Sequence, residues 1–142
     1  MAGVVRPLGA VGDEVFAAEL VGPGCAILPD ESAEPVGSPL HGVLTTVHPH
    51  AFVVQSGARA ALVHLGIDTV GLRGEGFIAL LDAGAVVEPG DPVLRWDVAA
   101  VGRAGLSTLC PVVAVQAASG AVRLLVRPGE RVAAGDPLLE WA

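Results

Sequence analysis

Residues 48–64 read HPHAFVVQSGARAALVH, and this stretch predicts a β-hairpin with a histidine near each end. A valine-rich run leads into a Gln-Ser-Gly-Ala turn, and a second apolar run follows the turn. A hairpin centred on its glycine pairs His50 directly with His64 and places Phe52 on the same face as Leu62. Two adjacent imidazoles on an apolar face predict either a metal site or a histidine-based transfer site. A one-residue slip in register would be expected to separate them.

The rest of the chain is punctuated by turns in the way that is typical of all-β proteins. Its 142 residues include 19 Gly and 11 Pro, and short β-branched runs lie between these turn residues. Many short strands at close spacing predict an antiparallel β-sandwich or barrel, with a few short helices. We expect helices over residues 77–83 and over 98–104, the second capped by Asp97. The predicted strands cover residues 43–47, 52–55, 60–65, 93–96, 111–116, 122–126 and 138–141.

One short internal repeat is visible. Residues 90–96 read GDPVLRW, and residues 135–141 read GDPLLEW. Each copy begins at the glycine of a turn-like Pro-Gly or Ala-Gly dipeptide, so the repeat is either a reused turn or a duplicated β motif.

Composition and charge exclude several classes of protein. The net charge of −7 argues against nucleic acid or an anionic membrane surface as the main partner, and it favours a partner with a basic face. Lysine is absent, which excludes a lipoyl or biotinyl carrier and a phosphate-binding loop of the Gly-Lys-Ser/Thr type. No apolar run reaches the roughly 20 residues that span a bilayer, and no signal peptide is recognisable. We therefore expect a cytoplasmic protein without membrane insertion, in which Cys25 and Cys110 are reduced and packed.

Residues 63–77 read VHLGIDTVGLRGEGF and resemble a known family. This segment closely resembles the active-histidine segment of the glucose-family IIA proteins of the bacterial phosphoenolpyruvate-dependent sugar phosphotransferase system. Further blocks resemble the family in the same order along nearly the whole chain, at residues 13–17, 21–24, 39–42, 50–52, 90–92 and 107–113. The resemblance implies a single IIA domain over residues 1–142. It also implies a β-sandwich of the barrel-sandwich hybrid type with two related halves, which favours the duplicated β motif.

The resemblance also implies a function. Such a protein is a phosphotransferase component that accepts a phosphoryl group on His64 from the histidine phosphocarrier protein. It passes the group to a cysteine of the IIB domain of a sugar-specific IIB/IIC permease, without a required cofactor. His50 is expected to donate a hydrogen bond to the phosphoryl oxygens. The sugar is chosen by the permease, and glucose and N-acetylglucosamine both fit. The phosphorylation state is also expected to control binding to regulatory targets.

Other residues are expected to flank these two histidines. Asp13 and Asp68 match acidic positions beside the family's active site, where a carboxylate keeps the phosphoryl group transferable by repulsion. His48 stands where many family members carry a threonine that orients the second histidine. An apolar ring expected to form a docking face comprises Val15, Phe16, Val21, Leu62 and Val70.

Zinc chemistry is the alternative. His48-x-His50 and His64-x-x-x-Asp68 are the two ligand patterns of lysostaphin-type zinc endopeptidases, although here they occur in the reverse chain order. Zinc held by His50 and His64 at a partner interface would instead make the protein a zinc-binding regulator.

Overall fold

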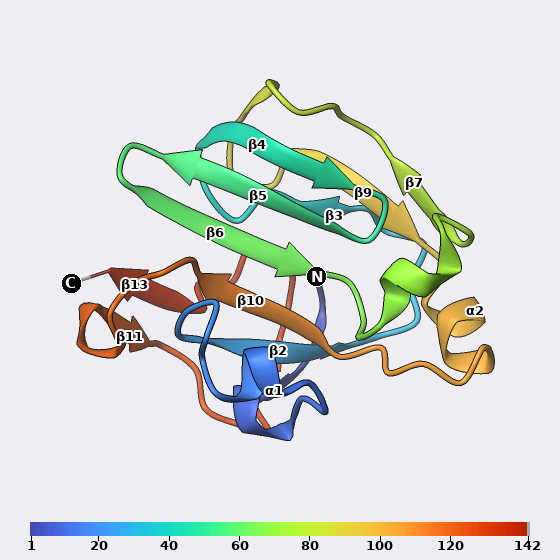
Figure 1. Ribbon diagram of the computed structural model, residues 1–142, viewed down its shortest axis with the longest axis horizontal. Helices are drawn as coiled ribbons and strands as arrows, with labels where there is room; N and C mark the ends of the chain where they lie inside the picture. The colour runs from blue at the N-terminus through green and yellow to red at the C-terminus, as the bar shows by residue number, and fades with distance from the viewer. Residues whose placement is uncertain (142) are drawn as a thin grey trace.

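A computed structural model describes residues 1–141, and strands make up most of its regular secondary structure (Figure 1). The strands are β1 (Gly3–Arg6), β2 (Gly24–Pro29), β3 (Val36–Gly37), β4 (Gly42–His48), β5 (Ala51–Ser56), β6 (Arg59–His64), β7 (Phe77–Ala79), β8 (Val86–Val87), β9 (Pro92–Trp96), β10 (Cys110–Ala114), β11 (Val122–Leu124), β12 (Arg131–Val132) and β13 (Leu139–Trp141). The helical segments are η1 (Leu8–Ala10), α1 (Glu14–Ala17), η2 (Thr69–Leu72), α2 (Val98–Arg103) and η3 (Ser119–Ala121).

The strands form one large sheet and two small ones. The large sheet has eight strands in the order β12-β1-β2-β10-β6-β5-β4-β8, and its pairings are antiparallel. A three-stranded sheet, β3-β9-β7, packs against one face of it, and β11 pairs with β13. This arrangement confirms the predicted all-β antiparallel sandwich. Within residues 1–141, no helix is long and apolar enough to cross a bilayer.

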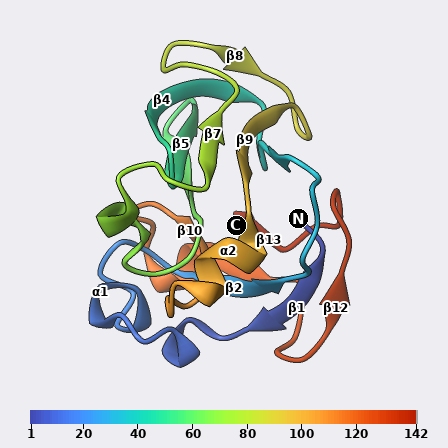
Figure 2. The same cartoon turned by 90° about the vertical axis from the view of Figure 1, so that its right-hand side faces the viewer.

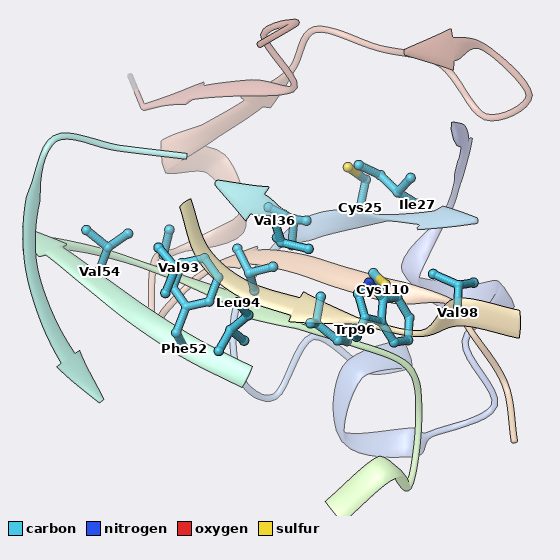
Figure 3. Packing of buried hydrophobic residues seen from close by; sticks show 14 of the residues in the cluster. Cys25, Ile27, Val36, Phe52, Val54, Val93, Leu94, Trp96, Val98 and Cys110 are labelled. Carbon is cyan, nitrogen blue, oxygen red and sulfur yellow. The ribbon is translucent and has the colours of Figure 1, made fainter. Parts of the chain in front are cut away.

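The main core lies between the large sheet and the three-stranded sheet (Figure 3). Phe52, Leu94 and Trp96 are all buried there. Cys25 and Cys110 are free and buried in the same core. Burial raises the pKa of the Cys25 thiol to about 11 and that of Cys110 to about 12, so both thiols stay protonated.

A second, smaller apolar cluster lies on the opposite face of the large sheet. Ala26 belongs to it, whereas its strand neighbours Cys25 and Ile27 belong to the main core, as the alternation of side chains along a strand requires. Phe16 of α1 and Ile67 of the loop after β6 also belong to this cluster. The cluster therefore fixes α1 beside the carboxyl end of β6, where His64 lies.

One helix prediction is confirmed and the other is wrong. Helix α2 begins after Asp97, whose Oδ1 accepts a hydrogen bond from the backbone N–H of Ala100 at 3.0 Å, as expected of a cap. Residues 77–83 are not helical. Phe77 begins β7, and its ring stacks on Trp96 of the neighbouring β9 with the ring centroids 5.7 Å apart. Cross-strand packing has overridden a local helical pattern here.

The repeat is a duplicated turn at the two edges of the large sheet. The backbone N–H of Glu88 donates to Asp91 Oδ2 at 2.8 Å, and that of Ala133 donates to Asp136 Oδ2 at 2.9 Å. The glycine before each aspartate has a positive φ, 89° in one copy and 93° in the other. The strands β8 and β12 that lead into these turns are the two edge strands, which lie far apart in Figure 2. The motif is thus duplicated in structure as well as in sequence.

Candidate functional site

The β5–β6 hairpin carries the two principal histidines, but its register differs from the predicted one. His64 pairs with Ala51, and Phe52 pairs with Val63 rather than with Leu62. The prediction is wrong by one residue because the turn occupies two residues, between the paired Ser56 and Arg59, instead of being centred on the glycine. Phe52 consequently points into the main core, whereas Leu62 packs against the second cluster.

His50 and His64 nevertheless lie side by side. Their ring centroids are 5.1 Å apart, with an angle of 72° between the ring planes. His50 precedes the first residue of β5, in the turn between β4 and β5, so its side chain is not bound by the alternation of that strand. The carbonyl of His50 accepts a hydrogen bond of 2.7 Å from the backbone N–H of Leu65. This bond holds the turn of His50 against the end of β6. The two histidines therefore lie side by side even though the predicted register is wrong.

The ring of His64 is fixed by a backbone carbonyl. Its Nδ1 lies 2.6 Å from the carbonyl oxygen of Gly66. Because a carbonyl oxygen can only accept, Nδ1 carries the proton, and Nε2 keeps its lone pair when the ring is neutral. Burial lowers the pKa of His64, while the bond to Gly66 and the charges of Asp13 and Asp68 act in the opposite direction. The structure therefore presents a neutral imidazole with Nε2 as its nucleophilic atom.

The neutral form of His50 is favoured as well, here by burial and by its neighbours together. Burial lowers its pKa, and repulsion from His64 and His48 lowers it further. The ring of His48 stacks on that of His50, with the centroids 5.6 Å apart and the planes inclined by 19°. His48 is itself exposed. The three histidines thus form a row that runs from the solvent to the half-buried His64.

Asp13 and Phe16 reach the site from α1. Asp13 Oδ1 accepts hydrogen bonds from the backbone N–H groups of Val15 at 2.9 Å and Phe16 at 3.4 Å, so its carboxylate caps the helix. The ring of Phe16 meets the ring of His64 edge to face, with the centroids 5.2 Å apart. Asp68 comes after His64 in the sequence, at the N-cap of η2, and has a left-handed φ of 60°. Both carboxylates act on His64 through their charge.

The expected docking residues separate into two groups. Val15 is 48% exposed and Val70 is 65% exposed, so both present apolar surface. Phe16 is only 7% exposed, and it contacts His64 instead of solvent. Val21 and Leu62 are partly buried against the second cluster.

Three residues that the sequence prediction did not single out also shape this region. Leu20, which follows α1, is 71% exposed, and its backbone N–H donates to the carbonyl of the exposed Val15 at 3.0 Å. Gly66 supplies the carbonyl that holds His64 Nδ1. Thr69 is buried, and its hydroxyl donates to the carbonyl of Leu65 at 2.7 Å. A hydroxyl four residues after an acceptor is a weak sequence signal, because it depends on the loop closing between them.

The residues that the structure describes do not form a zinc site by themselves. Within the described residues, no group of three or more His, Cys, Asp or Glu side chains could hold a metal ion. His50 and His64 supply two imidazoles, and Nδ1 of His64 is already bound to Gly66. The donor set therefore does not fit the three protein ligands of a hydrolytic zinc centre, and the hydrolase alternative is not supported.

Comparison with known proteins places this arrangement in a family. Residues 1–120 match the phosphoenolpyruvate-dependent sugar phosphotransferase system EIIA 1 family. The glucose-specific EIIA component of Oceanobacillus iheyensis is 36% identical over 114 residues, which make up 78% of this chain and 68% of that protein. The beta-glucoside-specific EIIBCA component of Bacillus subtilis is 40% identical over 114 residues. Of that relative, the chain covers 18%, and it spans 22% of a raffinose carrier protein from Pediococcus pentosaceus.

A solved structure shares the whole fold. The glucose permease IIA from Mycoplasma capricolum superposes with a TM-score of 0.85 at 32% sequence identity, covering 97% of this chain and 89% of that one. Sequence and structure thus agree over nearly the full length of the chain. The chain belongs to the glucose-type EIIA family of the phosphoenolpyruvate-dependent sugar phosphotransferase system.

Proposed function

We propose that this protein is a phosphocarrier in which Nε2 of His64 accepts a phosphoryl group from the phosphohistidine of the histidine phosphocarrier protein. The observation that carries this proposal is the bond between His64 Nδ1 and the Gly66 carbonyl, which leaves Nε2 unprotonated beside His50. Membership of the EIIA family supports the same role.

The transfer conserves atoms and charge without a further reactant. The Nε2 lone pair attacks phosphorus, the P–N bond to the donor histidine breaks, and its electron pair returns to the donor imidazole. In the second step a cysteine thiolate of the IIB domain attacks the same phosphorus, and the bond to His64 Nε2 breaks. Splitting the relay into two covalent steps lowers each barrier. No metal is needed for either step, so we propose that the protein requires no cofactor.

His50 stabilises the transferring phosphoryl group. Its ring lies edge to face with that of His64, close enough to donate an N–H to an oxygen of a group bound at Nε2. Charge develops on these oxygens in the transition state, so a fixed donor contributes more there than in water. Asp13 and Asp68 repel the same oxygens and thereby keep phospho-His64 reactive.

The exposed residues near the site support a proposal for the kind of partner. Val15 and Val70 expose apolar side chains beside the acidic Asp13 and Asp68, and the chain carries a net charge of −7. Such a surface fits an apolar contact rimmed by basic residues, as we propose for the histidine phosphocarrier protein and the IIB domain of a sugar-specific IIB/IIC permease. Phosphate added to His64 would also repel a regulatory target that binds the unphosphorylated face. We place the reaction in the cytoplasm, with glucose or N-acetylglucosamine as the sugar.

The experiment that tests this proposal is a reconstituted phosphorylation reaction. Wild type, His64→Gln and His41→Gln are incubated with phosphoenolpyruvate, enzyme I and the histidine phosphocarrier protein, and their intact masses are measured. We expect one acid-labile phosphate on wild type and on the His41→Gln control, and none on His64→Gln. Full phosphorylation of His64→Gln would overturn the proposal. So would an unphosphorylated wild type that binds one equivalent of zinc, which would favour a zinc-binding regulator.

A further inference from the structure

Thr69 is a buried polar side chain next to the site, and the phosphoryl relay described above does not use it. Only 1% of its surface is exposed, although it lies five residues from the half-buried His64. Its hydroxyl donates to the carbonyl of Leu65 at 2.7 Å. Burying a hydroxyl is unfavourable unless it makes a hydrogen bond, so this bond defines where the threonine can lie.

The Leu65 backbone connects the two histidines. It directly follows His64, and its N–H donates to the carbonyl of His50 at 2.7 Å. Its carbonyl, which belongs to the Leu65–Gly66 peptide, is held by Thr69. A third bond, of 3.0 Å from Ile67 N–H to the carbonyl of Ser107, fixes the loop on its far side. The loop after His64 is thus tied to three other segments.

Gly66 lies at the centre of this loop in a backbone conformation that favours glycine. Its φ is +75°, and a Cβ atom built there would lie 2.6 Å from Cγ2 of Thr69. The methyl group of Thr69 therefore packs directly against Gly66, while its hydroxyl holds the peptide that precedes Gly66. The carbonyl of Gly66 is the one that accepts the proton of His64 Nδ1.

We propose that Thr69 is a positioning residue for His64. By holding the Leu65–Gly66 peptide, it aims the Gly66 carbonyl at Nδ1, keeps the proton on that nitrogen and leaves Nε2 free to attack phosphorus. Without the hydroxyl, the loop loses its closing bond, and part of the His64 population carries its proton on Nε2. That population cannot accept a phosphoryl group. The inference rests on the proposed role of His64, but it concerns which nitrogen of the unphosphorylated ring carries the proton.

The test compares variants that separate the hydroxyl of Thr69 from its shape. Thr69→Val keeps the shape and removes the hydrogen bond, and Thr69→Ser keeps the hydroxyl. Ser38→Ala is the matched control, because the buried hydroxyl of Ser38 also donates to a backbone carbonyl, that of Leu40 at 2.7 Å. Ser38 precedes the start of β4, whereas His48 ends that strand, so its loss leaves the histidine row intact.

Two readouts are needed. Nitrogen-15 NMR of the unphosphorylated protein at neutral pH reports whether the proton of His64 lies on Nδ1 or Nε2. The initial rate of phosphorylation by the phosphorylated carrier protein, measured against carrier concentration, separates kcat from KM. We expect Thr69→Val to show a new Nε2–H population and a kcat roughly tenfold lower with little change in KM, since small misplacements of reacting groups are costly. Thr69→Ser and Ser38→Ala should both behave as wild type.

A Thr69→Val protein that keeps the Nδ1–H form and matches Ser38→Ala in rate would overturn the inference. If Thr69→Val does not fold, Thr69→Ala compared with Thr69→Ser carries the same test. The NMR measurement involves no phosphoryl donor, so it tests Thr69 even if His64→Gln shows that another residue accepts phosphate. Failure of the proposed function and failure of this inference are therefore distinguishable.

Discussion

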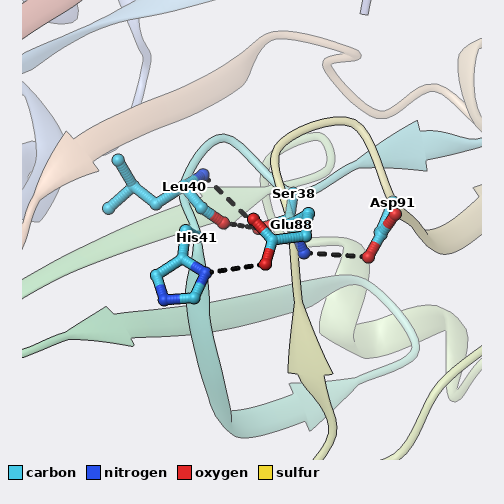
Figure 4. A network of polar contacts seen from close by, with 5 residues as sticks. All are labelled: Ser38, Leu40, His41, Glu88 and Asp91. Atoms are coloured by element: carbon cyan, nitrogen blue, oxygen red, sulfur yellow. Dashed lines mark hydrogen bonds and ion pairs between the residues drawn. The ribbon is translucent and has the colours of Figure 1, made fainter.

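Two histidines beside strands of the large sheet each meet a hydrogen-bond acceptor, in very different surroundings. Just before β4, Nδ1 of His41 lies 3.0 Å from a carboxylate oxygen of Glu88, with both side chains more than half exposed (Figure 4). At the end of β6, Nδ1 of the half-buried His64 is bound by the uncharged Gly66 carbonyl. A contact between exposed groups holds a ring only loosely. A carbonyl in a half-buried loop fixes the tautomer without adding a charge, and this difference is what makes His64 the nucleophile in our account.

The largest effect is expected from replacing His50, the imidazole that lies beside His64. We expect His50→Gln to accept phosphate but to pass it on to the IIB domain roughly 10²–10³-fold more slowly, because the amide does not hold its N–H where the imidazole ring holds a donor to the transferring oxygens. Rapid-quench transfer from the phosphorylated variant to an isolated IIB domain measures this rate. His41→Gln is the matched control and should transfer at the wild-type rate. Equal rates for the two variants would show that the environment of His64 has no special role.

A smaller effect is expected from replacing His48, whose ring lies one ring further from His64. His48 stacks on His50, and such ring pairs contribute modestly to orientation. We expect His48→Ala to slow onward transfer about two- to tenfold, which the same rapid-quench assay detects. Restoring an aromatic ring with His48→Phe should recover most of the rate. Failure of phenylalanine to rescue would mean that the ring nitrogens of His48, and not its stacking, matter.

The smallest expected effect concerns pH. Burial lowers the pKa of His64, so its neutral form, which has a free Nε2, persists to more acidic pH than for an unperturbed histidine, whose pKa is about 6.5. The Asp68 charge raises the pKa of His64, and Asp68→Asn should therefore lower it further. An NMR titration of the His64 ring checks both statements. A His64 pKa that rises in Asp68→Asn would contradict the assigned sign.

Much of this fold was predictable because the sequence alternates and turns so regularly. The strand runs around Phe52 and Leu94, and the cap at Asp97, follow from local patterns. The strands β1 and β2 and the helix α1 were not predicted. Strands β1 and β2 pair with each other, and Phe16 anchors the short α1 in the second cluster. The two strands and the helix therefore all depend on tertiary contacts.

The site was predictable in part for a similar reason. The motif around His64 identified the two histidines, but the hairpin register depends on whether the turn takes one residue or two, which the glycine alone does not specify. Gly66 and Thr69 act through a closed loop whose bonds exist only after folding. The resemblance supplied the proposed role of the histidines, whereas the hydrogen bonds and ring contacts that support this role required the structure.

The most direct test of the central claim is to locate the phosphate on the ring. Phosphorus-31 and nitrogen-15 NMR of the phosphorylated wild-type protein, with only histidine nitrogen labelled, identifies the residue and the nitrogen that carry it. Our account predicts a single phosphohistidine at Nε2 of His64, with its proton still on Nδ1. Phosphate at Nδ1 of His64, or on His41, His48 or His50, would contradict it.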